Sequence, residues 1–73
     1  MNEEDIQQFA EENKFDVRKF EGSHYRLFSS TGERILDVYI KHKKGRIVQN
    51  TILQWKTNKW LVVHTLEELN KLI

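Results

Sequence analysis

The chain contains no cysteine, no proline and only three glycines among its 73 residues. The absence of cysteine excludes disulfide bonds and thiolate metal sites. The absence of proline means that none of the predicted strands is barred from the interior of a sheet. The three glycines are isolated, so there is no glycine-rich phosphate loop, and the sequence has no Gly-x-Ser-x-Gly nucleophile elbow. These absences remove several common classes of enzyme.

Long apolar runs are also missing, since none approaches the roughly 20 residues of a membrane-spanning helix. The chain opens Met1-Asn2-Glu3-Glu4-Asp5, which is acidic where a signal peptide is basic. We therefore expect a cytoplasmic protein with no membrane contact. The length allows one domain, residues 1–73. Four Phe, two Trp and two Tyr supply enough large side chains for a core.

Helical patterns lie at the two ends of the chain. Asn2 is a favourable N-cap, and apolar residues at helical spacing predict a helix over 3–13. The segment Thr65-Leu66-Glu67-Glu68 fits a capping box, in which Thr65 covers a free N–H and Glu68 reaches back to the cap. An apolar stripe after it predicts a second helix from 66 to the end.

Between the helices the apolar residues alternate with a period of two, which is typical of strands. Short turns, beginning with the one at Gly22, separate the segments and favour antiparallel pairing of neighbours. We predict an α+β fold, with an N-terminal helix, a three- to five-stranded antiparallel meander sheet and a C-terminal helix, both helices on one face of the sheet. The predicted strands are 15–20, 24–29, 35–41, 47–56 and 60–63, and a basic loop spans 41–46.

The net charge of +1 conceals an uneven distribution. Residues 1–21 carry seven acids against three bases, whereas 22–60 carry eight bases against two acids. No acidic residue lies between Asp37 and Glu67. Such a split marks a surface for an anionic partner or, equally, a well-solvated exterior.

The alternation also predicts what each sheet face carries. If Leu36 and Val38 face the helices, the opposite face mixes cations with aromatic rings: Arg18, Phe20, His24, Arg26, Phe28, Tyr39, Lys41 and Lys56. Rings stack on bases while Lys and Arg meet phosphates, so this face suits single-stranded nucleic acid or a nucleotide. We expect a non-catalytic binding module whose anion-binding residues are Arg26, Tyr39, Lys41, Lys43, Lys44, Arg46, Lys56 and Trp60.

Two other interpretations stay open. The rings of this face are equally suited to burial in a homodimer or against a protein partner, which would make the chain an inhibitor or interaction domain. Asp37, Gln54 and Lys56 also resemble the acid and Gln-x-Lys pattern of restriction-type, metal-dependent nucleases. His24, His42 and His64 lack the spacing of metal ligands, and we expect surface or turn histidines and no metal or cofactor site.

The order helix, three strands, helix is similar to that of double-stranded RNA-binding domains, but the acidic start of the last helix would repel phosphate. Three segments instead resemble small uncharacterised proteins of phages and mobile elements, in which an H/Y-x-R-L strand, a D-x-Y strand and a T-x-K-W turn recur. They are His24-Tyr25-Arg26-Leu27, Leu36-Asp37-Val38-Tyr39 and Thr57-Asn58-Lys59-Trp60. The resemblance implies an accessory or anti-defence role and no catalytic residues.

Overall fold

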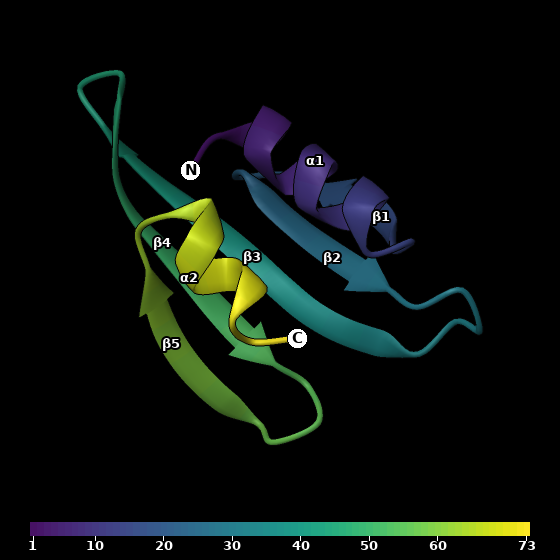
Figure 1. Ribbon diagram of the computed structural model, residues 1–73. Helices are drawn as coiled ribbons and strands as arrows, with labels where there is room; N and C mark the ends of the chain where they lie inside the picture. The colour runs from purple at the N-terminus through teal and green to yellow at the C-terminus, as the bar shows by residue number, and fades with distance from the viewer.

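Five antiparallel strands form one sheet in the computed structural model, which describes residues 1–73 (Figure 1). The strands follow one another in space as β1-β2-β3-β4-β5, so the predicted α+β meander is confirmed, with β3 at its centre. The elements are α1 (Glu3–Glu12), β1 (Asp16–Phe20), β2 (His24–Phe28), β3 (Arg34–Lys43), β4 (Arg46–Gln54), β5 (Lys59–Val63) and α2 (Leu66–Asn70).

Both helices begin at the residues that the capping patterns indicate. Asn2 accepts a hydrogen bond from the Asp5 N–H at 3.0 Å, and the Asp5 carboxylate accepts one from the Asn2 N–H at 2.9 Å, which completes a capping box for α1. Thr65 caps α2 by accepting from the Glu68 N–H at 3.2 Å. The Glu68 carboxylate accepts from the N–H of His64, not of Thr65, at 3.4 Å. The α2 helix ends at Asn70, earlier than predicted.

Both helices lie on the same face of the sheet, as Figure 1 shows. From α1, Ile6 and Phe9 are fully buried, and α2 contributes Leu69. These helix residues share one core with the helix-facing side chains of β2, β3, β4 and β5, namely Tyr25, Leu27, Leu36, Val38, Ile40, Ile52 and Val63. The alternation of the strands therefore selects the buried face, and burial of this apolar surface is the main stabilising term. We call the opposite side of the sheet the open face.

Two irregularities change the predicted strands. Leu27 pairs with Leu36 but Phe28 pairs with Arg34, so Ile35 is an extra residue, and it packs against the core instead of alternating onto the open face. The predicted basic loop is instead the end of a β-hairpin, because β3 and β4 continue to Lys43 and Arg46. Lys44 and Gly45 have φ of 53° and 76°, and positive φ at both central residues is the signature of a type I′ turn.

No helix in the structure has both the length and the apolar character needed to cross a membrane.

Candidate functional site

The open face presents side chains in two rows that run across the strands. One row follows the register Arg18, Arg26, Asp37, Leu53 and Trp60, and the next follows Phe20, His24, Tyr39, Thr51 and Val62. The rows confirm the predicted placement of six residues on this face: Arg18, Phe20, His24, Arg26, Tyr39 and Trp60. Phe28 and Lys41 lie outside the two rows but share the face by the alternation of β2 and β3. Only some of these side chains are free to bind a partner.

Asp37 is the organising residue of the open face. It is fully buried, with 0% of its surface exposed, although it lies on the side without helices. Its carboxylate accepts hydrogen bonds from Arg26 Nε at 3.0 Å and from Trp55 Nε1 at 2.7 Å. His24 Nε2 lies 2.6 Å from the other carboxylate oxygen, and since a carboxylate only accepts, this nitrogen carries the hydrogen. We call Asp37, His24, Arg26 and Trp55 the Asp37 cluster.

The charges of the cluster stabilise one another. Burial alone would raise the pKa of the Asp37 carboxyl, but the hydrogen bonds donated by Arg26, Trp55 and His24 outweigh it and hold this pKa below its usual value. The same bond to Asp37 raises the pKa of Arg26. The pair is therefore ionised at neutral pH, and neither charge is left to attract a ligand of its own.

The rings of the open face stack on one another across the strands. His24 and Tyr39 are stacked with centroids 4.1 Å apart, Phe20 lies 4.9 Å beyond His24, and Trp60 lies 5.5 Å beyond Tyr39. The Arg26 guanidinium covers the Phe20 ring at 5.1 Å. These contacts occupy the ring faces that a base would need, so the face offers fewer stacking positions than its composition suggests. Trp60 is the exception, at 56% exposed.

The predicted binding residues are therefore not equivalent. Arg26 and Tyr39 belong to the internal contacts just described. Lys41 lies on the open face and is exposed, next to Tyr39 in the alternation of β3. Trp60 also lies on this face, on β5.

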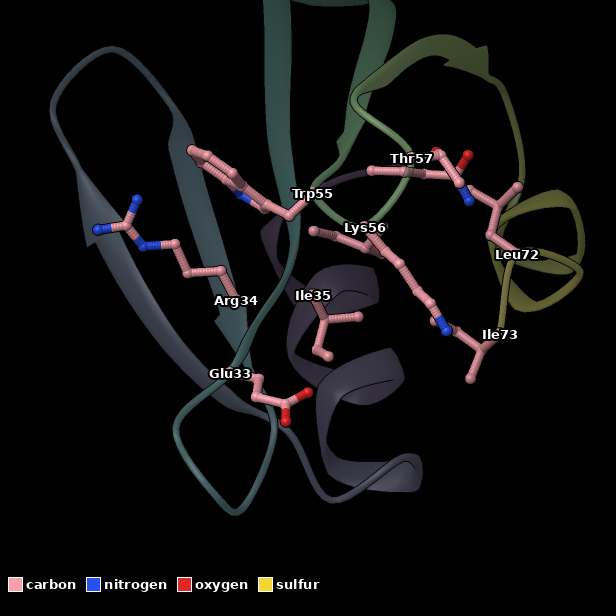
Figure 2. Close-up of a pocket in the computed structure, with 10 residues that line it drawn as sticks. Glu33, Arg34, Ile35, Trp55, Lys56, Thr57, Leu72 and Ile73 are labelled. Carbon is pink, nitrogen blue, oxygen red and sulfur yellow. The ribbon is translucent and has the colours of Figure 1, made fainter.

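The placement of Lys56 on the open face is wrong. β4 ends at Gln54, and Lys56 belongs to the turn that follows. Figure 2 shows its side chain extending toward Ile73, on the side where the helices lie, while Arg34 and Trp55 point the other way. It lines a pocket of about 540 Å³ whose apolar wall includes Ile35 and Ile73. Gln54 and Lys56 lie on one side and Trp55 lies on the other, so the two-residue period holds here. The prediction misplaces Lys56 because the period does not say which of its two sides shares a face with Asp37.

The remaining predicted cations gather on what we call the basic hairpin, residues 41–49. β2 last pairs with β3 at Tyr39, and β5 last pairs with β4 at Asn50, so beyond these positions β3 and β4 pair only with each other. The hairpin projects past the rest of the molecule (Figure 1). All its residues from 41 to 48 are exposed, and its charged side chains are Lys41, Lys43, Lys44 and Arg46.

The nuclease-like trio is not brought together. Asp37 points to the open face, whereas Gln54 pairs with Leu36, whose side chain faces the helices. Lys56 points away from Asp37 as described. No group of three or more His, Asp or Glu side chains in the structure is arranged to hold a metal ion.

The expectation that all three histidines are plain surface or turn residues is wrong for His24. It is partly buried, with a side chain 17% exposed, and it is committed to Asp37. Sequence reasoning also missed Trp55 as a donor to this cluster. The one available signal was the lone acid Asp37 within an otherwise apolar strand, since such a carboxylate requires partners when buried.

Comparison of the chain with protein-family models, with curated proteins and with solved structures finds no match.

Proposed function

We propose that this chain is a small, non-catalytic nucleic-acid-binding module that contacts phosphates through the basic hairpin. The observation that carries the proposal is the hairpin itself: four cations and no acid on an exposed two-stranded ribbon that projects from the molecule. Phosphate contacts supply most of the affinity of such binding and need no fixed sequence.

The shape of the hairpin supports the same proposal. From Ile40 to the turn at Lys44 the ribbon reaches about 13 Å, at roughly 3.3 Å a residue. A two-stranded ribbon is narrow enough to enter the major groove of duplex DNA, and it can equally follow a single strand. The internal stacking of Tyr39 and His24 reduces the number of rings that a single strand could use. We therefore expect the hairpin, and not the rings of the open face, to make the main contacts with both duplex and single-stranded nucleic acid.

The test is fluorescence anisotropy with labelled single-stranded and duplex oligonucleotides over a series of salt concentrations. Changing Lys43, Lys44 and Arg46 together to alanine should flatten the slope of log affinity against log salt by about two units for single strands, at roughly 0.7 per phosphate contact. The fold should survive, because an exposed turn holds no core. No binding at low salt by the unaltered protein would overturn the proposal.

A matched pair of single substitutions sharpens this test. Lys43→Ala and Lys56→Ala each remove one exposed lysine, but only Lys43 lies on the basic hairpin. We expect the slope to fall by about 0.7 for Lys43→Ala and to stay unchanged for Lys56→Ala. Equal effects of the two substitutions would mean that general charge, and not the hairpin, governs binding.

An accessory role of the phage or mobile-element type is consistent with such a module, because sequestering a nucleic acid or occupying its grooves needs no catalytic residue. The resemblance of residues 24–60 supports this part of the proposal. Expression of the unaltered chain and of the Lys43, Lys44 and Arg46 triple variant in phage-challenged cells tests it. Equal phage yields with and without the unaltered chain would count against an anti-defence role.

A second candidate function is self-association or protein binding. The specific observation that favours it is the exposed apolar edge of the sheet, where Trp60 is 56% and Val62 is 51% exposed. Both side chains lie on β5, which pairs with β4 only from Asn50 onward, outside the basic hairpin. Binding of nucleic acid to the hairpin therefore leaves them available to a protein partner.

A further inference from the structure

The two edge strands of the sheet differ in chemistry. In β1, three of the five residues are charged, namely Asp16, Arg18 and Lys19. In β5, four consecutive residues, 60–63, are apolar. Charged side chains along an edge discourage pairing with another chain, and an apolar edge without them invites it. The asymmetry identifies β5 as the edge that is suited to a partner strand.

The side chains of β5 also favour a particular partner. Trp60 and Val62 lie on the open face, because they pair with Leu53 and Thr51 across β4. If a second β5 lay antiparallel to the first with the twofold axis at Leu61, Trp60 would lie opposite the partner's Val62, and Val62 opposite the partner's Trp60. Directly opposed side chains are about 4.5–5.5 Å apart and stabilise a sheet when one is aromatic and the other β-branched. The two most exposed apolar side chains of β5 would thus cover each other.

The same register would also bring opposite charges of the two copies close together. Lys59 pairs with Gln54, so its side chain lies on the helix-covered side of the sheet. There it would lie opposite the partner's Val63, which is followed within a few residues by the partner's Glu67 and Glu68. Each copy would place its exposed Lys59 near the acidic first turn of the other copy's α2, twice by symmetry. An antiparallel pair of β1 strands centred on Val17 would also place Asp16 opposite the partner's Arg18, but such exposed ion pairs add little stability and cover no exposed apolar side chain.

We propose that β5 pairs antiparallel with β5 of a second copy of this chain, in a register centred on Leu61, and joins two five-stranded sheets into one. The twofold axis stands perpendicular to the sheet, so both open faces lie on one side and the two basic hairpins point to opposite ends of the dimer. This inference specifies the self-association proposed above, and it is independent of nucleic-acid binding because it is tested without nucleic acid.

Sedimentation velocity and light scattering of the unaltered chain at high micromolar concentration should give a dimer. Val62→Asp should weaken dimerisation by about tenfold or more, since it buries an unpaired carboxylate against an indole ring. Val48→Asp is the matched control, because Val48 is 49% exposed but lies on the basic hairpin beyond the last residue paired with β5. It should leave the dimer intact. A monomer before any substitution, or equal effects of the two, would overturn the proposal.

The register has its own test, because the chain contains no cysteine and an introduced one is unique. In Leu61→Cys the two cysteines would lie directly opposite each other, within the Cα separation that a disulfide spans. Oxidation should give a covalent dimer in high yield. In Val62→Cys the two cysteines would be about 8 Å apart, too far for a disulfide. Cross-linking of Val62→Cys but not Leu61→Cys would overturn the proposed register.

Discussion

Replacing Asp37 with alanine should remove a large part of the stability of this protein. The substitution deletes the acceptor of hydrogen bonds from Arg26, Trp55 and His24. The apolar packing of β3 on the helices is untouched, since Asp37 points to the open face. Any loss of stability therefore measures the Asp37 cluster and not the hydrophobic core.

The expected loss follows from the burial of the pair. Removing one partner of a buried ion pair costs about 3–5 kcal/mol, because the other charge is left without compensation. The Arg26 side chain is 22% exposed, so water can partly solvate it, and we expect a loss of about 3 kcal/mol. At about 0.05–0.15 kcal/mol per residue, a chain of 73 residues has a total stability of about 4–11 kcal/mol. The variant should therefore keep about 1–8 kcal/mol of stability and unfold at a clearly lower urea concentration.

Urea denaturation followed by far-ultraviolet circular dichroism measures this loss, because it does not depend on the fluorescence of Trp55. Asp16→Ala is the control, since it removes an exposed aspartate from β1 and should change stability by less than about 0.5 kcal/mol. Adding Arg26→Ala to Asp37→Ala should cost less than the sum of the two single losses. A loss below about 1 kcal/mol for Asp37→Ala would refute the structural role of the cluster and leave its carboxylate free for a ligand.

Three further results are expected. First, hydrogen bonds hold the pKa of Asp37 in the folded protein below the 3.8 of the unfolded chain. The ionised carboxylate therefore stabilises the fold above about pH 4, and this stabilisation is lost as the pH falls through the pKa of the folded protein. In urea melts over a range of pH, the stability of Asp37→Asn should depend less on acid than that of the unaltered chain. Leu36→Asp should abolish the cooperative thermal transition, since it buries an unpaired charge in the core. Asn50→Leu should stabilise the protein by about 1 kcal/mol in urea titrations, because the buried Asn50 Oδ1 has no hydrogen-bond partner; destabilisation would show that this oxygen is satisfied.

Most of the fold could be predicted because the local patterns agree with one another. The capping residue Asn2 marks the start of α1, and the two-residue period places Leu36 and Val38 in the core. The prediction failed at Ile35, where a bulge turns the side chain toward the core, and at Lys56, where the phase of β4 relative to β3 was assigned wrongly. A bulge is an interstrand property, so neither strand's own sequence announces it.

The residue types of the candidate site could be predicted from the sequence, but which of these side chains are free to bind a partner could not. The cations from Lys41 to Arg46 are contiguous in the chain, so their clustering needed no structure. Whether Arg26 and Tyr39 are free depends on their neighbours in β2 and β3, and those neighbours are Asp37 and His24. Residue types alone cannot distinguish a ring that awaits a base from a ring that already stacks on another ring.

The sequence by itself determined the order of helices and strands, the buried face of the sheet and the excess of positive charge in its middle, because caps, periodicity and charge are local properties. Only the tertiary structure decided that β3 and β4 extend into a basic hairpin, that Asp37 joins three donors from two other segments, and that the apolar β5 is left as an edge. Each of these depends on which residues lie opposite one another across strands. That register is fixed by the simultaneous packing of the whole sheet against its helices.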